Sequence, residues 1–347
     1  MDFSGRNPLN RFGSLFFKRH PLLTGGLPLG LSLMAGLIFY TDLPGRSHSG
    51  PLPPLTEQER VLRRNLKAHV DYLAGEIGER NLSEYEELKT AARYIRETLS
   101  RFGYRISDQA YTARGKIVRN IEAVKPGVSM PEKILVMGAH YDSVFGSPGA
   151  NDNGSAVAAL LETARLLAED SLAKTIRFVA FVNEEPPFFQ TDLMGSRVYA
   201  RRCRENGDDI IGMISLETIG FYSDEPGSQK YPFPLGMLYP DTGDFIGFVS
   251  NLGSKSFLDR CIRAFRNTTD FPSEGTAAPG WMTGIGWSDH WAFWKEGYAG
   301  VMVTDTAPFR YPHYHTSRDT PDKIDYDRTA RVTAGLSRMA AVLADAE

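Results

Sequence analysis

The order of apolar segments along the chain constrains its fold more than any other feature. Short apolar runs predict buried strands at residues 133–137, 175–182, 210–216 and 299–303. Between them, apolar residues at helical spacing predict helices at 154–167, 193–204 and 254–265. Strands that alternate with helices favour a parallel sheet covered by those helices. The sequence therefore predicts an α/β fold: a three-layer sandwich with a mixed, mostly parallel central sheet and helices on both faces.

The segments around this alternation give further predictions. Two matches to the helix capping box, Thr56 with Glu59 and Ser83 with Glu86, predict helix starts. Short strands are expected near 105–112 and 117–124, and a final helix from residue 326. Residues 224–247 are rich in Pro, Gly and aromatic side chains and predict a long loop. This loop is expected to be either a wall or lid of a substrate pocket or a plain surface loop.

The N-terminal region predicts a membrane tether. Pro21 to Thr41 carries no charged side chain, and at ~1.5 Å per residue it spans roughly 30 Å, the thickness of the hydrocarbon layer. Lys18 and Arg19 precede it, which favours a cytoplasmic segment 1–20. The expected organisation is a transmembrane signal anchor at 21–41, a linker at 42–55 and one catalytic domain at 56–347. A cleaved signal peptide is the alternative.

This topology predicts a single-pass protein of the cell (inner) membrane, with its catalytic domain on the periplasmic or extracellular side. The formal net charge of −3 implies no basic face, so nucleic acid is not an expected partner. The two cysteines, Cys203 and Cys261, form no C-x-x-C motif. They are expected either to pair in an oxidising compartment or to remain free thiols within helices.

Residues with metal-binding or acid–base side chains follow the predicted strands. In open α/β sheets, sites form beyond the carboxyl ends of strands. The residues at these positions are His140, Asp142, Asp152, Glu184, Glu185, Glu217, His313 and His315. Imidazoles and carboxylates without a thiolate favour zinc, manganese or cobalt. The sequence therefore predicts a metal site along this edge of the sheet.

Two local patterns refine this prediction. Successive residues on a strand end point in opposite directions, so one of Glu184 and Glu185 can bind a metal while the other faces the substrate as a base. Asp142 lies two residues after His140, where its carboxylate can accept the second imidazole N–H and fix the tautomer.

Six ordered motifs carry a resemblance to a known family. They are GAHYDSV (138–144), GANDNGSAVAALLE (149–162), NEE (183–185), LETIG (216–220), SDHWAFWKEGYAGVM (288–302) and HYHTSRDT (313–320). Over most of residues 56–347, the chain resembles the co-catalytic zinc aminopeptidases related to bacterial leucyl aminopeptidase. That superfamily also includes glutamate carboxypeptidases and glutaminyl cyclases.

The resemblance implies a role for each matched residue. His140 and Glu217 would hold one zinc ion, Glu185 and His315 the other, and Asp152 would bridge the two. Two zinc ions per chain are expected, with manganese or cobalt as possible substitutes. Glu184 would be the general base, and Asp142 would orient His140. The resemblance also implies a cis peptide bond between Asp152 and Asn153.

The implied activity is that of a two-zinc exopeptidase, foremost an aminopeptidase that hydrolyses N-terminal residues from peptides. Two departures keep alternatives open. Glu217 stands where the family's aminopeptidases usually have aspartate, and residues 284–287 lack the tyrosine that helps to bind the oxyanion. The alternatives are a carboxypeptidase, a dipeptidase-type metallohydrolase, or an acyltransferase like glutaminyl cyclase. Substrate contacts are expected from Tyr231, Ser288, Asp289 and His290.

Overall fold

A single mixed sheet forms the centre of the fold in the part of the chain that the structure describes. The computed structural model describes residues 41–233 and 235–345, and strands run in the order β1-β2-β4-β3-β5-β8-β6-β7. Four adjacent strands, β4, β3, β5 and β8, are mutually parallel. β2 and β6 pair antiparallel to β4 and β8, at the two ends of this parallel set. The bounds are β1 Arg105–Ala113, β2 Lys116–Lys125, β3 Met130–His140, β4 Lys174–Phe181, β5 Asp209–Glu217, β6 Ile246–Asn251, β7 Ser273–Ala278 and β8 Gly300–Thr304.

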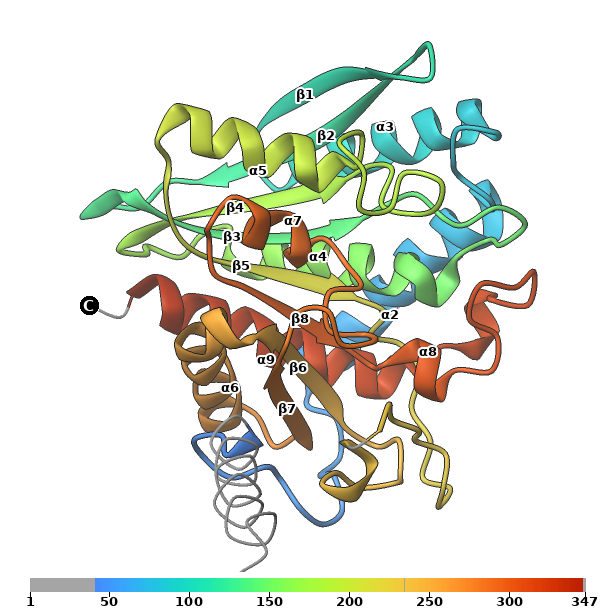
Figure 1. Ribbon diagram of the computed structural model, residues 1–347, viewed down its shortest axis with the longest axis vertical. Coiled ribbons are helices and arrows are strands. Elements are labelled where there is room, and N and C mark those ends of the chain that lie inside the picture. Colours follow the sequence, from blue (N-terminus) through green and yellow to red (C-terminus); the bar gives the residue numbers. More distant parts are fainter. Residues whose placement is uncertain (1–40, 234, 346–347) are drawn as a thin grey trace, which may run out of the picture. The chain divides into compact units, whose positions relative to one another are not determined.

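Helices cover both faces of the sheet, as the sequence predicts (Figure 1). Alternate side chains of β3 divide between two cores: Leu135 and Met137 pack on one face, and Ile134 and Val136 on the other. The first face is covered by α2 Glu57–Val70, α3 Tyr85–Arg101, α4 Ala156–Leu167, α6 Lys255–Thr268 and α9 Tyr326–Asp345. The second face is covered by α5 Gly195–Asn206 and α7 His290–Lys295.

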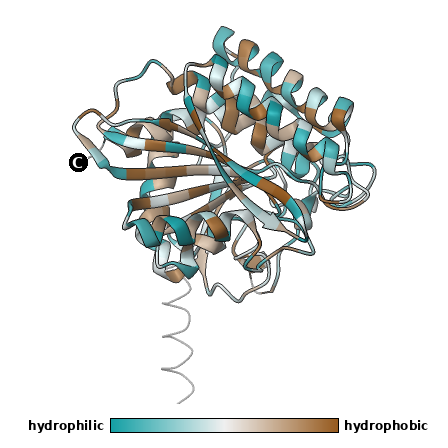
Figure 2. Ribbon diagram, turned by 90° about the horizontal axis from the view of Figure 1, so that it is seen from above, coloured by the Kyte–Doolittle hydropathy of each residue, from teal (hydrophilic) through white to brown (hydrophobic). Residues whose placement is uncertain are grey.

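The hydropathy of the central strands fits their burial on both faces. Figure 2 shows central strands that are largely hydrophobic, beside helices that carry both hydrophobic and hydrophilic residues. Strands covered on both sides read as continuous apolar runs, whereas a helix needs only one apolar face. This difference explains why the four parallel strands and their helices could be found from the sequence.

Several local predictions have clear outcomes. The Thr56 capping box is present, with reciprocal hydrogen bonds to Glu59. The second box is wrong, because α3 begins at Tyr85 without a side-chain cap. Instead, the side-chain oxygen of Asn81 accepts the N–H groups of residues 83 and 84. Strands β6 and β7 and the short helix α8 Ala307–Arg310 are among the elements that were not predicted.

Two predictions concern the N-terminal region and the cysteines. The predicted membrane span at 21–41 lies almost wholly outside the described residues, and no helix among residues 41–345 is long and apolar enough to cross a bilayer. The predicted linker 42–55 is hydrogen-bonded to the domain, for example through Arg266 to the carbonyl of Pro44 at 3.2 Å. Cys203 and Cys261 are both buried free thiols.

Candidate metal centre

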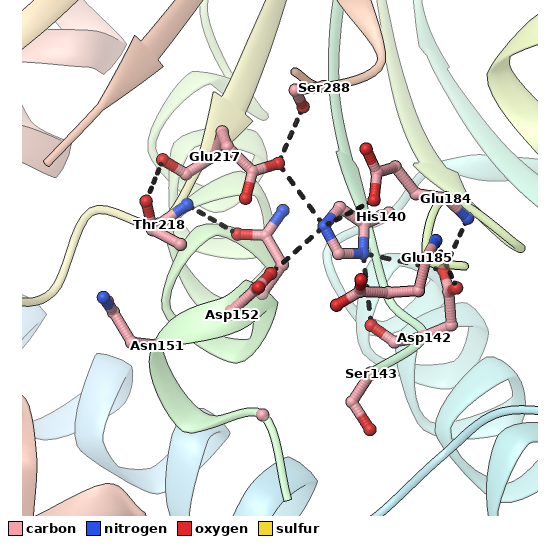
Figure 3. A network of polar contacts seen from close by, with 12 residues as sticks. His140, Asp142, Ser143, Asn151, Asp152, Glu184, Glu185, Glu217, Thr218 and Ser288 are labelled. Carbon is pink, nitrogen blue, oxygen red and sulfur yellow. Dashed lines mark hydrogen bonds and ion pairs between the residues drawn. The ribbon is translucent and has the colours of Figure 1, made fainter. Parts of the chain in front are cut away.

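The predicted site residues meet at one edge of the sheet. β3 ends at His140 and β5 at Glu217, while Glu184 and Glu185 follow β4. These three strands are neighbours and run parallel, so their carboxyl ends lie side by side. The chain before α4 brings a fifth residue, Asp152, to the same edge. Figure 3 shows these side chains converging from their separate strands and loop.

The first group of potential ligands consists of His140, Asp152 and Glu217. The Nε2 atom of His140 lies 3.4 Å from Asp152 Oδ1 and 3.4 Å from Glu217 Oε2. One ligand atom from each residue lies within 4.8 Å of the others, which is close enough for all three to bind one ion. All three side chains are buried.

The second group consists of Asp152, Glu185 and His315. The Nε2 atom of His315 lies 3.0 Å from Asp152 Oδ2 and 3.3 Å from Glu185 Oε2. Asp152 thus turns one carboxylate oxygen toward each group, which is the geometry of a bridging ligand. The peptide bond between Asp152 and Asn153 is cis, as the family resemblance implies. His313, the other histidine of this segment, belongs to neither group.

The donor atoms fit a site for cations. His140 Nε2, Asp152 Oδ1 and Glu185 Oε1 are buried without a hydrogen-bond partner among the described residues. Such orphaned polar atoms are rare in folded proteins, and bound ions are one explanation. Asp142, Asp152, Glu184, Glu185 and Glu217 gather five carboxylates in this buried space. Two dications would offset most of their negative charge.

The side chains shift one another's pKa values strongly when no cation is present. Burial opposes the charge on His140, but Glu184 and Glu217 outweigh it and raise its pKa well above the ordinary value. Burial, together with Asp152, raises the pKa of Glu185 to about 8 despite the nearby histidines. Burial also raises the pKa of Glu184 well above its ordinary value, with His140 opposing. This group of buried carboxylates therefore attracts both cations and protons.

Asp142 has a wider role than the sequence predicted. Its carboxylate lies 3.6 Å from His140 Nδ1, and its main-chain carbonyl lies closer, at 3.1 Å. The same carboxylate accepts the backbone N–H of Glu184 and of Glu185, each at 3.1 Å. Asp142 therefore fixes the ends of β3 and β4 relative to each other. It thereby also positions His140, Glu184 and Glu185.

Two positioning residues were not found from the sequence. Asp319 is fully buried and accepts the backbone N–H of Asn151 at 2.8 Å and of Asp152 at 3.0 Å. Arg80 is also fully buried. Its guanidinium donates to the main-chain carbonyl of Tyr141, which follows His140, and to that of Gly149, which lies three residues before Asp152. Asp319 lies within the last of the six motifs, which was a weak signal. The arginine lies in no recognisable pattern.

The structure corrects the role expected for the segment 288–290. Ser288, Asp289 and His290 were expected to contact substrate, but all three are 0% exposed. Ser288 donates to Glu217 Oε2 at 2.7 Å and so positions a candidate metal ligand. The Nε2 atom of His290 lies 2.8 Å from the carbonyl of Ile285, and burial lowers its pKa to about 4. These residues support the site from within the core.

Tyr231, the fourth residue expected to contact substrate, lines a cavity beside Glu217. The cavity encloses about 760 Å³ of empty space, part of it open to solvent. The segment predicted as a loop forms one of its walls, through residues such as Tyr231, Leu235, Tyr239 and Phe245. The segment therefore lines a cavity, and its contact with substrate stays a prediction.

Comparisons with known proteins agree with this geometry. Residues 120–340 match the family described as Peptidase family M28. The chain is 35% identical over 313 residues to YfbL of Escherichia coli (strain K12), an uncharacterized protein, covering 88% of this chain and 93% of that one. It is 24% identical to leucine aminopeptidase 1 of Arthroderma otae, covering 78% and 68% of the two chains.

A solved structure shares the fold. The zinc aminopeptidase BSAP from Bacillus subtilis superimposes with a TM-score of 0.67 at 16% identity, covering 82% of this chain and 95% of that one. The family match spans more than half of the chain and includes all seven of the residues assigned to the metals, the base and its support. The chain therefore belongs to peptidase family M28 and is a metallopeptidase of that family.

Proposed function

We propose that this chain is a two-zinc aminopeptidase that removes N-terminal residues from peptides. One observation carries the proposal: the two oxygens of Asp152 face two separate ligand groups, one with His140 and Glu217, the other with Glu185 and His315. Imidazole and carboxylate ligands suit zinc. The solved structure that shares this fold is described as a zinc aminopeptidase, which also supports zinc. Manganese or cobalt could occupy the same ligands.

Bound zinc would lower the pKa of a water molecule toward neutrality and polarise the peptide carbonyl. Glu184 is placed to act as general base, because its carboxylate lies 3.7 Å from His140 Nε2 yet belongs to neither ligand group. It would accept the proton of the attacking water and pass it to the leaving amine. Asp142 holds its backbone in position.

Tyr314 can serve where the family's tyrosine is missing from residues 284–287. Its ring stacks on His315 with centroids 3.8 Å apart, and it lines the cavity beside Glu217. With no cation bound, burial and the carboxylates of Asp152 and Glu185 raise its pKa well above the ordinary value. A tyrosine hydroxyl is protonated at neutral pH even at its ordinary pKa of about 10. A protonated phenol beside the ligands can donate a hydrogen bond to the oxyanion.

Two features favour an aminopeptidase over the alternatives. A carboxypeptidase needs a cation to pair with the C-terminal carboxylate of its substrate, and no Lys or Arg is among the described residues that line the cavity. A glutaminyl-cyclase-like acyltransferase needs only one zinc ion, whereas this chain keeps both ligand groups. Glutamate is one methylene longer than the aspartate usual at this position. A hydrogen bond from Ser288 holds the Glu217 carboxylate beside the other two residues of the first group.

The membrane tether remains part of the proposal. The uncharged segment Pro21–Thr41 and the basic residues before it support an anchor with a cytoplasmic N-terminus. The catalytic domain would then act on peptides on the periplasmic or extracellular side of the membrane. Protease accessibility of the domain in intact cells, compared with spheroplasts, tests this orientation.

The activity itself is tested with the purified full chain in mild detergent and added zinc. The substrates are aminoacyl anilides with a free N-terminus, N-blocked peptides with a free C-terminus, and N-terminal glutaminyl peptides. The proposal predicts cleavage of the anilides alone, lost on chelation and in Glu184→Gln. Cleavage of only the blocked peptides would establish a carboxypeptidase, and cyclisation of only the glutaminyl peptides an acyltransferase; either result overturns the proposal.

A further inference from the structure

The cavity beside the metal centre extends along one row of residues across the sheet. Glu217 of β5 pairs with Thr304 of β8, Thr304 with Gly247 of β6, and Gly247 with Glu274 of β7. All four residues line the cavity. Neighbouring strands lie ~4.8 Å apart, so the row is roughly 14 Å long. Gly247 carries no side chain, and a Cβ at this position would lie 3.2 Å from the carbonyl oxygen of Thr304 and 3.4 Å from the methyl group of Thr306.

Glu274 is an acid without a cationic partner at the far end of this row. No described Lys, Arg or His nitrogen forms an ion pair with its carboxylate within 4.0 Å. Arg266, the cation that lowers the pKa of Glu274, is itself bound to the side chain and carbonyl of Ser273 and to the carbonyl of Pro44. Burial raises the pKa of Glu274, and Arg266 offsets this only in part.

The space between Glu217 and Glu274 is walled by apolar and aromatic groups. Tyr231 stacks on Tyr239 with ring centroids 5.7 Å apart, and Trp287 stacks on Phe309 at 6.4 Å. All four rings line the cavity. Such walls suit an aliphatic stem, and aromatic faces attract a cation, most of all a planar guanidinium. The cavity thus joins an apolar channel to a carboxylate, that of Glu274, which forms no ion pair within 4.0 Å among the described residues.

We propose that this cavity receives the side chain of the substrate's N-terminal residue and that Glu274 makes it selective for arginine, and next for lysine. This inference rests on the proposed aminopeptidase function. The scissile carbonyl lies at the Glu217 end, and the side chain extends along the row of strands. Its methylenes contact the aromatic walls, and its cation pairs with Glu274. A shorter side chain does not reach Glu274, and a neutral one of the same length leaves the carboxylate unpaired.

The test compares substrates that differ only in charge. The full chain with added zinc is assayed on anilides of arginine and of citrulline, its neutral isostere, and likewise on lysine and norleucine. A hydrogen-bonded ion pair predicts a kcat/KM for arginine roughly 10- to 100-fold above that for citrulline. In Glu274→Gln the ratio falls to near one. Glu205→Gln, at an exposed position on α5, keeps the wild-type ratio.

Each outcome decides a separate point. An arginine-to-citrulline ratio near one in the wild type, with the anilides still cleaved, overturns the assignment of Glu274 and leaves the aminopeptidase function standing. An unchanged ratio in Glu274→Gln does the same, and cleavage of any anilide by that variant shows that it is folded. Failure to cleave every anilide overturns both the inference and the function on which it rests.

Discussion

Replacing Arg80 with lysine tests whether a buried clamp holds the metal site together. The guanidinium is 0% exposed and donates to five main-chain carbonyls, those of Leu73, Gly78, Tyr141, Pro148 and Gly149. Tyr141 follows the candidate ligand His140, and residues 148–149 lead into the turn that carries Asp152. Burial lowers the pKa of Arg80 to about 10, so it remains charged at neutral pH.

The size of the effect follows from the number of donors. A lysine ammonium has three N–H bonds on one nitrogen, so at least two of the five carbonyls lose the donor that Arg80 supplies. The carbonyls of Leu73 and Gly149 keep a backbone donor each, from Gly78 and Gly154, so one or two of the other three are expected to be left unpaired. At about 1–3 kcal/mol for each unpaired carbonyl, the free energy of unfolding falls by roughly 1–6 kcal/mol. The loosened ligands should also weaken zinc binding by about 10- to 100-fold.

The assay measures both quantities on the purified full chain. Urea unfolding followed by tryptophan fluorescence gives the free energy, and competition with a chelator gives the zinc affinity. Arg64→Lys is the matched control, because Arg64 is exposed on α2. If Arg80→Lys unfolds within about 1 kcal/mol of the wild type and binds zinc equally well, the clamp does not act as described.

Three further predictions follow from the site. Glu184→Gln should lower kcat by about 10²- to 10⁴-fold and leave the zinc content unchanged, as measured by metal analysis beside the kinetics. Tyr314→Phe should lower kcat roughly tenfold or more with little change in KM; an unchanged kcat would remove the tyrosine from the mechanism. Because burial lowers the pKa of His290 to about 4 from 6.5, its contribution to stability is complete above pH ~6.5 and is lost as the pH falls toward ~4. Wild type should therefore lose up to about 3 kcal/mol relative to His290→Gln between pH 7 and pH 4 in urea unfolding, and parallel curves would show that His290 titrates normally.

The parts of the fold that were predictable are those with a strong local pattern. Strands β3, β4, β5 and β8 are buried on both faces and read as apolar runs, and the helices between them have one apolar face. Three candidate metal ligands, His140, Glu185 and Glu217, were found because they lie at or just after the carboxyl ends of these strands. In contrast, β7 reads Ser-Glu-Gly-Thr-Ala-Ala, which has no apolar alternation, so Glu274 was not recognised as part of a sheet.

Long-range contacts explain the remaining differences. Asp319 reaches Asn151 and Asp152 across more than 160 positions, and nothing in the sequence near either segment indicates that pairing. His290 lies in a motif beside the site, so a role in binding substrate was expected, but the motif cannot show which way the side chain faces. The capping box predicted at Ser83 is absent, because the side chain of Asn81 accepts the backbone N–H groups of residues 83 and 84 instead.

Zinc stoichiometry tests the central claim most directly. The metal-free full chain is titrated with zinc by calorimetry, beside the variants His315→Gln and Asp152→Asn. Two ligand groups that share Asp152 predict two equivalents in the wild type, one in His315→Gln, and weakened binding of both ions in Asp152→Asn. One equivalent in the wild type, or two undiminished equivalents in His315→Gln, would contradict the two-zinc site.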